Sequence, residues 1–439
     1  MNTNLNMTDL ILKKRDGGKL SQAEIKFFVK GICDGTIPDY QASALLMAIY
    51  FQGLDHDETF ELCNAMRYSG DVIDLSGIRG IKVDKHSTGG VGDKTTLIVA
   101  PLVAACGVPI AKMSGRGLGF TGGTVDKMEA IPGFRTSMEP EEFMAQVNSI
   151  GMAVIGQTAH ITPADKKLYA LRDVTGTVEN LGLISSSIMS KKLASGSDAI
   201  VLDVKCGHGA FMESEAAAAE LGQTMCEIGN AAGKQTVAVI TDMNQPLGCA
   251  VGNSLEAIEA IEVLKGKGPA DITELSLKLA GIMVYLGGRV KTVREGEIIA
   301  QQALQGHGGL EKLRSFITKQ GGDARVIDDY SLFGTAAVQR DFVASEGGYV
   351  QSIDARAIGM ASQRTGAGRE KKEDSIDFTA GIYLHKKVGD RVSKGDVIAT
   401  VYGNNKKKVE AAVKDVAAAY TLGREKTEPP KLVKHVLGI

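Results

Sequence analysis

The sequence predicts an α/β protein in which a helical N-terminal segment precedes a large sheet domain and a third, differently patterned segment. Three changes of pattern support this. Residues 8–69 carry apolar residues at helical spacing, residues from about 80 to 333 alternate short β-branched runs with helices, and later residues alternate apolar and polar positions. A chain of 439 residues has room for two or three domains and a large core.

The N-terminal segment predicts a small bundle of helices. Ser21 and Glu24 have the spacing of a capping box and precede an apolar stripe over residues 25–32. Pro38 suits the start of a second helix, and a third is expected from about 57 to 68. None of these helices carries an obvious chemical group of its own.

The middle of the chain predicts a largely parallel sheet covered by helices. The candidate strands are residues 81–83, 108–112, 153–155, 199–204 and 236–241. Helices are expected near 95–106, 122–130, 139–149, 213–232, 254–264, 271–287, 294–306 and 308–318. Two further helices within 163–195 interrupt the alternation. The ligand site of such a sheet lies beyond the carboxyl ends of its strands.

The composition excludes several classes of protein. Lys and Arg number 50 and Asp and Glu 52, so the net charge of −2 gives no support for a nucleic-acid or membrane surface. No run of 18 apolar residues occurs, and the N-terminus lacks a long apolar core. The six cysteines form no C-x-x-C pair and lie mostly in apolar runs, which predicts buried thiols in a reducing compartment. We therefore expect a soluble, cytoplasmic protein.

Two glycine-rich loops stand out within residues 83–134. The first spans 87–93 and the second 112–124, and each follows an apolar run and precedes a helix. Glycines allow positive φ and close backbone approach, and the first turn of a helix offers unpaired N–H groups beside a positive dipole end. The side chains around both loops include Lys85, Ser87, Lys112, Ser114 and Thr124. The two loops therefore predict one shared phosphate site.

Neither loop fits the two best-known nucleotide motifs. A Walker A loop needs Gly directly before Lys, but Asp93 separates Gly92 from Lys94. A dinucleotide fingerprint needs G-x-G-x-x-G, and the glycines at 115, 117 and 119 have the wrong final spacing. Neither ATP nor NAD is indicated.

The segments KHSTGGVGD and MSGRGLGFTGGTVDKMEAIPGF closely resemble the thymidine and pyrimidine-nucleoside phosphorylase family, with the bacterial pyrimidine-nucleoside phosphorylases looking closest. ISSSIMSKKLA and AGIYLHKKVGDRVSKGDVIATVYGN extend the resemblance over essentially the whole chain. It implies reversible phosphorolysis of pyrimidine nucleosides to free base and pentose 1-phosphate. It also implies phosphate as co-substrate, no organic cofactor and a homodimer formed through the helical domain.

The resemblance also implies the domain organisation. A small helical domain is expected from 1–69 with 163–195, an α/β phosphate-binding domain from 70–162 with 196–333, and a C-terminal α+β domain from 334–439. The last resembles a biotinyl/lipoyl-like half-barrel. The Met-Lys turn that carries the attachment lysine in carrier domains is absent, so Lys386 and Lys387 are expected to be surface charge.

The phosphate site that the resemblance implies draws on both glycine loops. Its residues are Lys85, His86, Ser87, Thr96, Lys112, Met113, Ser114 and Thr124. Each of the lysines, serines and threonines in this set, taken singly, is more often a solvated loop residue. Together they favour function, because lysines with hydroxyl and backbone donors are sufficient to bind phosphate.

The base site that the resemblance implies lies on the two helices of residues 163–195. Its residues are Tyr169, Arg172, Ile184, Ser187 and Lys191. Ser187 and Lys191 are one helical turn apart and project from the same face. The ordinary alternative is a solvent-facing helix with Lys191 and Lys192 as surface charge. The edge of uracil presents two acceptors and one N–H donor, which two cations and a hydroxyl suit.

Three residues are expected to carry catalysis, namely His86, Arg172 and Lys191. A lone histidine is usually structural, but His86 occupies the loop that should touch both substrates. Its imidazole can donate a proton near neutral pH, and the matching histidine of the family meets O2 of the pyrimidine. Stabilising negative charge on the departing base is the effect expected to dominate the reaction.

The resemblance further suggests a structural potassium ion and shows two departures. Backbone carbonyls of Gly92, Lys94, Leu247 and Ala250, with the carboxylate of Glu259, match the potassium site of some family members. Phe120 stands where many relatives carry histidine, which is expected to alter the rim of the base pocket. His208 replaces a small residue and is expected to be a neutral variation.

Two other functions have some support in the sequence. An anthranilate-type phosphoribosyltransferase shares a glycine-rich loop, but it needs magnesium and hence paired acids. Asp93 is present, yet VKCGHGAF replaces such a pair after residues 199–204, and the C-terminal segment also argues against it. A non-catalytic nucleoside- or phosphate-binding protein would not need His86, Arg172, Ser187 and Lys191 together.

Overall fold

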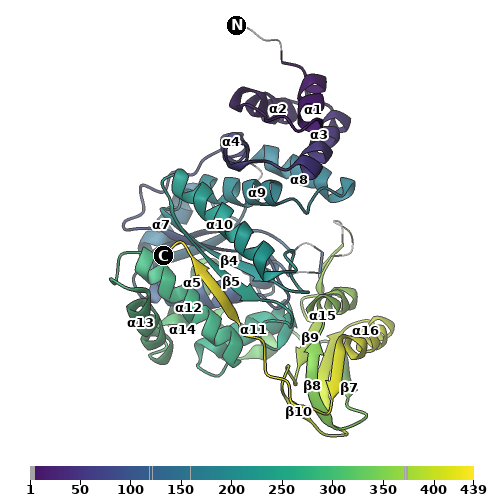
Figure 1. Cartoon of the computed structure of the whole chain (residues 1–439). Coiled ribbons are helices and arrows are strands. Elements are labelled where there is room, and N and C mark those ends of the chain that lie inside the picture. Colours follow the sequence, from purple (N-terminus) through teal and green to yellow (C-terminus); the bar gives the residue numbers. More distant parts are fainter. Residues whose placement is uncertain (1–4, 118, 121, 159, 370, 372–373) are drawn as a thin grey trace.

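The computed structural model describes residues 5–117, 119–120, 122–158, 160–369, 371 and 374–439. Figure 1 shows the N-terminal helices above a sheet domain, with the C-terminal domain beside the lower part of that sheet domain. Residues 118 and 121 of the second glycine loop are outside the described residues.

The helical domain combines two separate segments of the chain. Its helices are α1 Met7–Arg15, α2 Gln22–Asp34, α3 Asp39–Gln52, α4 His56–Arg67, α8 Pro163–Thr175 and α9 Leu181–Ala194. The expected capping box of Ser21 and Glu24 starts α2, and Asp55 starts α4 in the same way. Leu168 of α8 belongs to the same buried core as Phe28 and Leu45. The two inserted helices therefore pack with the N-terminal bundle.

The central sheet has the strand order β1-β4-β5-β13. These strands are β1 Val83–Ser87, β4 Ala199–Cys206, β5 Gln235–Asp242 and β13 Val433–Leu437. The first three are parallel, and β13 is antiparallel to β5. A second, two-stranded parallel sheet joins β2 Ile110–Ser114 to β3 Met152–Gly156. The last strand of the predicted C-terminal domain therefore returns to the central sheet.

The first two strands run further than the sequence predicts. The expected strand 81–83 is observed as Val83–Ser87, and the expected strand 108–112 as Ile110–Ser114. Lys85 and His86 therefore lie on β1 and not in a loop, whereas Lys112 lies on β2 as its expected strand range allows. The reason is that β1 pairs with β4 along its whole length, and a paired backbone holds polar residues in a strand despite their low β propensity.

Eight helices of the α/β segment agree with their predicted ranges to within two residues. They are α5 Thr95–Ala105, α6 Thr124–Glu129, α7 Pro140–Ile150, α10 Glu215–Ala231, α11 Ser254–Leu264, α12 Ala270–Leu286, α13 Val293–Gln305 and α14 Gly308–Lys319. Every side chain of α5 from Thr95 to Ala104 is buried, as expected for a helix that is apolar on all sides. This burial fixes the helix whose first turn follows the first glycine loop.

The C-terminal segment forms two small sheets and shares a strand with the α/β segment. The α/β segment ends with η1 Ala324–Ile327 and η2 Tyr330–Phe333. The elements of the C-terminal segment are β7 Val338–Val343, β8 Gly348–Ile353, α15 Ala355–Ser362, η3 Gln363–Ala367, β9 Gly381–Leu384, β10 Arg391–Val392, β11 Val397–Gly403, α16 Lys406–Ala419 and β12 Tyr420–Gly423. The sheets have the orders β10-β8-β12 and β6-β9-β11-β7, where β6 is Ala250–Gly252 of the α/β segment. Backbone pairing therefore joins the two segments twice: β6 of the α/β segment pairs with β9, and β13 of the C-terminal segment pairs with β5.

Lys387 is not the surface charge that the sequence suggests. Its ammonium donates to the carbonyl oxygens of Pro246 and Gly248, the latter at 2.7 Å, and lies 3.1 Å from the carboxylate of Asp271. The C-terminal segment thus holds the 246–250 loop through this lysine in addition to the pairing of β6 with β9.

Within the described residues, no helix combines the length and apolar character needed to cross a bilayer. The same residues contain no group of three His, Cys, Asp or Glu side chains placed to hold a metal ion. All six cysteines are free, and Cys33 is exposed, in contrast to the expected burial.

Candidate active site

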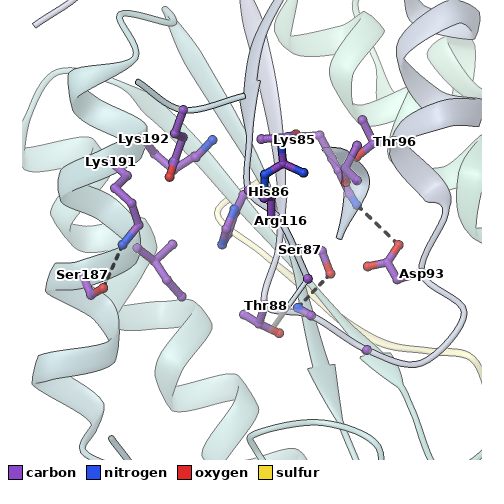
Figure 2. Close-up of a pocket in the computed structure, with 18 of the residues that line it drawn as sticks. Lys85, His86, Ser87, Thr88, Asp93, Thr96, Arg116, Ser187, Lys191 and Lys192 are labelled. Carbon is purple, nitrogen blue, oxygen red and sulfur yellow. Dashed lines mark hydrogen bonds and ion pairs between the residues drawn. The ribbon is translucent and has the colours of Figure 1, made fainter. Parts of the chain in front are cut away.

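A cavity separates helices α8 and α9 from the carboxyl ends of β1 and β2. Its volume is about 290 Å³, close to the lower end of the roughly 300–1,000 Å³ that small-molecule sites occupy. The residues predicted for phosphate all line it, together with four of those predicted for the base: Tyr169, Ile184, Ser187 and Lys191. Figure 2 shows Ser187 and Lys191 on one side, Lys85, Asp93 and Thr96 on the other, and His86 between them.

On the sheet side, Lys85 is a buried cation among carboxylates. Its ammonium donates to the hydroxyl of Thr95 and lies 3.8 Å from the carboxylates of both Asp93 and Asp203. Although burial alone would raise the pKa of Asp93, Lys85 and Lys205 hold it well below its usual range. The lysine and the first glycine loop are therefore fixed to each other by charge.

Lys112 and Lys192 share a single buried carboxylate. The ammonium of Lys112 is 3.3 Å and that of Lys192 is 2.7 Å from the two oxygens of Asp84. Burial would raise the pKa of Asp84, but the two lysines lower it to about 2. Burial lowers the pKa of Lys112 to about 8, with repulsion from Lys192 and Lys85 added to the effect and Asp84 opposing it. Two cations that share one anion leave net positive charge for a bound phosphate.

Lys192 and Asp84 were not predicted as site residues. Asp84 carried little signal, because it lies among charged and polar neighbours in the sequence. Lys192 carried none, since it is the second lysine of a pair on a helix and only the packing of α9 against β1 brings it to Asp84. Its side chain is 2% exposed, so it is not the surface charge of the ordinary alternative.

The pKa of His86 is not the one expected of a residue that donates a proton near neutral pH. Its ring lines the cavity and is half-buried. Burial, and then the charges of Lys192 and Lys112, keep the pKa of His86 well below its usual range. The imidazole is therefore neutral at pH 7 and can offer an N–H hydrogen bond but not a positive charge. A bound anion would raise this pKa, because an opposite charge favours the protonated form.

On the helical side, α9 presents Ser187 and Lys191 to the cavity as their spacing predicts. The Lys191 ammonium donates to the Ser187 hydroxyl at 2.9 Å and to the carboxylate of Asp165 on α8. Tyr169 and Ile184 add a phenol and an apolar wall. The group offers one cation and one hydroxyl to the edge of a planar ring.

Arg172 is placed differently from the prediction. It is not among the described residues that line the cavity. Its guanidinium donates to the carbonyl oxygens of Thr177 and Leu183, each at 3.0 Å, and to that of Val178 at 2.5 Å. The carbonyls of Thr177 and Val178 belong to the connection between α8 and α9, and that of Leu183 lies in the first turn of α9. Buried acceptors at such positions need donors. In this structure Arg172 therefore fixes the connection that orients the base-site helices.

The two departures from the family also lie away from the cavity. Phe120 packs under the guanidinium of Arg356, 5.3 Å from the ring centre, and His208 is exposed with its backbone N–H bound to Asn244. Neither is among the described residues lining the cavity, whereas Phe211 is. The expected effect of Phe120 on the rim of the base pocket does not arise in this structure.

Three of the five expected potassium ligands, Leu247, Ala250 and Glu259, lie together, but the Lys94 side chain lies among them. The ammonium of Lys94 donates to the carbonyls of Leu247 at 3.0 Å and Ala250 at 2.8 Å, and to Glu259 at 2.5 Å. The carbonyl of Gly92 accepts a backbone hydrogen bond from Lys94 instead. This arrangement does not fit a potassium ion, because the lysine takes its place.

A helical bundle facing an α/β domain with two phosphate-type loops defines a class of glycosyl-transferring enzymes. Family models described as "Glycosyl transferase family, helical bundle domain" and "Glycosyl transferase family, a/b domain" match residues 8–70 and 79–308. Residues 349–423 match the "Pyrimidine nucleoside phosphorylase C-terminal domain". The chain belongs to the pyrimidine-nucleoside phosphorylase family, which confirms the predicted family and fold class.

Two curated relatives show how far the likeness extends. The pyrimidine-nucleoside phosphorylase of Staphylococcus haemolyticus (strain JCSC1435) is 53% identical over 98% of this chain and 99% of its own. That of Bacillus subtilis (strain 168) is 54% identical over the same shares. The anthranilate phosphoribosyltransferase of Thermus thermophilus matches with a TM-score of 0.58 and 20% identity, covering 71% of this chain and 99% of its own. The last likeness concerns the fold alone.

Proposed function

We propose that the protein catalyses the reversible phosphorolysis of pyrimidine nucleosides to free base and pentose 1-phosphate. The observation that carries this proposal is one cavity with cations on two facing walls. Lys85 and Lys112 stand at the glycine loops, and Lys191 stands on α9 across the cavity. The near full-length identity to proteins named pyrimidine-nucleoside phosphorylase supports the same activity.

In this proposal phosphate binds between the two glycine loops and attacks C1′ of the pentose. A phosphate oxygen forms the new bond to C1′, and the bond from C1′ to the base nitrogen breaks with its electron pair going to the base. The pentose passes through an oxocarbenium-like state. Lys191 and the N–H of His86 stabilise the negative charge on the departing base, the effect that dominates such steps.

The neutral state of His86 favours an order in which phosphate binds before a proton is passed to the base. Burial, and then the charges of two lysines, keep the pKa of His86 low, and a bound phosphate dianion would raise this pKa by opposing those charges. With phosphate bound, His86 would be better able to pass a proton to the departing base. Base departure without an attacking phosphate would be disfavoured.

The carboxylates beside the same cavity argue against the phosphoribosyltransferase alternative. That chemistry needs carboxylates free to hold magnesium. Asp84, Asp93 and Asp203 beside the cavity each lie within 3.8 Å of at least one lysine ammonium. The shared fold with an anthranilate phosphoribosyltransferase therefore does not extend to a free acidic pair at these positions.

Release of free base is expected to require inorganic phosphate. Uridine, deoxyuridine and thymidine would be followed by absorbance with and without phosphate, and with EDTA added to both. We expect turnover only with phosphate and no loss with EDTA. Equal release without phosphate would indicate a hydrolase, and loss with EDTA would favour the transferase. Binding without any turnover would indicate a non-catalytic protein.

We further propose a cytoplasmic homodimer that forms through the helical domain. The free cysteines, with Cys33 exposed, suit a reducing compartment. Tyr40, Met47 and Phe51 share one face of α3 and are exposed, with Tyr40 at 75% and Phe51 at 76%. Exposed apolar faces of this kind are typical of interfaces. Light scattering is expected to give a dimer mass that falls to a monomer in Phe51→Glu, and a monomeric wild type would contradict the proposal.

A further inference from the structure

Lys94 is a buried lysine directly after the first glycine loop. Its side chain is fully buried, and its ammonium contacts the carbonyl oxygens of Leu247 and Ala250 and the carboxylate of Glu259. An ammonium has three N–H donors, so these three acceptors use all of them. Two carbonyls and one carboxylate also form the all-oxygen set that suits a monovalent cation.

The charge at this position is retained. Burial by itself would lower the pKa of Lys94, but Glu259 and then Glu256 raise it above its ordinary value. Glu259 also accepts the backbone N–H groups of Cys249 and Ala250. One positive and one negative charge are therefore matched and hydrogen-bonded, the condition under which a buried pair is tolerated.

The space around the ammonium is closely packed. A Cβ atom added at Gly248 would lie 2.2 Å from the Glu259 carboxylate and 3.1 Å from the Lys94 ammonium. A Cβ added at Gly92 would lie 2.5 Å from the Leu247 carbonyl oxygen. The glycine loop and the 247–250 loop therefore touch at backbone level around the lysine. A separate ion would have to displace the ammonium.

The contact connects to the phosphate site through the first glycine loop. The backbone N–H of Leu247 donates to the carbonyl of Val91 at 3.0 Å. Asp93, the neighbour of Lys94, lies 3.8 Å from Lys85, and Thr95 accepts a hydrogen bond from Lys85. The position of Lys94 therefore sets the position of the groups that hold Lys85.

We propose that the Lys94 ammonium is a built-in monovalent cation that fixes the first glycine loop and makes this protein independent of potassium. Lys94 is then a positioning residue for the phosphate site. The consequence for phosphate kinetics rests on the proposed function, whereas the consequence for cation binding does not.

The wild-type protein tests the proposal without any substitution. Thermal unfolding and phosphate affinity would be measured in potassium, sodium and tetramethylammonium chloride at equal ionic strength. We expect the three unfolding temperatures to agree within about 1 °C and the phosphate affinities within about two-fold. A potassium-specific rise in either would overturn the proposal.

Removing the ammonium should create a cation site in its place. In Lys94→Ala the three oxygen acceptors lose their cation. We expect the unfolding temperature to rise with potassium or ammonium concentration and to saturate, because binding to the folded state alone stabilises it. Tetramethylammonium, which is too large, should have no such effect. The KM for phosphate should rise by about 10-fold and be restored by potassium.

Two matched variants separate this role from a merely structural one. Lys94→Ala with Glu259→Gln removes the anion as well and should abolish the response to potassium. Lys387→Ala loosens the same loop from the other side, through Gly248, and should lower stability with no cation-specific rescue.

A folded Lys94→Ala whose unfolding temperature does not respond to potassium or ammonium would overturn the proposal. If the variant does not fold, the wild-type measurements decide. Absence of phosphorolysis in every protein would count against the proposed function and leave the unfolding measurements valid.

Discussion

Replacing Lys85 by methionine is expected to lower kcat/KM for phosphate by about 10³-fold, the upper range for losing one preorganised charge-stabilising group. The reason is that the substitution does more than remove a cation. Lys85 lies 3.8 Å from the carboxylates of Asp93 and Asp203. Without its ammonium, Asp93 would present a negative charge to an anionic substrate, and like charges oppose binding.

The substitution is designed to keep the packing of the strand. Methionine preserves most of the apolar stem of Lys85 within β1. Asp203 keeps a second partner, the ammonium of Lys205 at 2.7 Å. Calorimetry should show phosphate binding lost, whereas nucleoside binding should be retained because α9 is untouched.

Lys82 provides a matched control for this prediction. It precedes β1 and pairs with Asp198 at 2.8 Å, and it is not among the described residues lining the cavity. Lys82→Met should therefore leave phosphate kinetics close to wild type. A Lys85→Met enzyme within ten-fold of wild type, or with unchanged phosphate affinity, would contradict the assignment of Lys85 to the phosphate site.

Local sequence patterns were sufficient for much of this molecule. The helices of the α/β segment follow from apolar periodicity, and the capping box of Ser21 and Glu24 follows from spacing alone. The glycine loops could be recognised as an anion site because backbone N–H groups and glycine conformations depend on adjacent residues only. The order of Ser187 and Lys191 on one face of α9 is likewise a property of one helix.

Most of the misplaced features depend on contacts between residues far apart in the sequence. β13 pairs with β5 and β6 pairs with β9, and each pairing crosses the predicted domain boundary. Arg172 is different, because its carbonyl acceptors lie nearby in the sequence, but no motif shows that its side chain turns to them. Lys94 matched a potassium-site position through its backbone, but its side chain reaches residues more than 150 positions away. A family resemblance indicates which residue positions form a site. Only the packed structure shows which atoms of those residues lie in the site.

The second large effect is expected on the opposite wall of the cavity. Lys191→Met should lower kcat/KM for nucleoside by about 10²-fold or more, the scale for removing one donor aimed at developing charge. Lys191 is held by Ser187 at 2.9 Å and by Asp165, so its ammonium is fixed before substrate arrives. Phosphate affinity of the free enzyme should change little, because the substitution leaves β1, β2 and both glycine loops intact.

The buried partner of Lys191 requires a second variant. Asp165 is 4% exposed, and without Lys191 its carboxylate would lose its ion pair, which lowers stability and places a negative charge beside the base. The double variant Lys191→Met with Asp165→Asn removes that charge. If activity returned in the double variant, the loss in the single variant would belong to the stray carboxylate and not to the missing ammonium.

Lys166 on α8 is exposed and serves as the control, since Lys166→Met changes the same helical domain away from the cavity. We expect Lys166→Met to match wild type, and Lys191→Met and the double variant to share the loss in kcat/KM for nucleoside. Phosphate binding by calorimetry should be equal in all four proteins. Loss of phosphate binding in Lys191→Met, or nucleoside kinetics within a few-fold of wild type, would show that Lys191 does not act on the departing base.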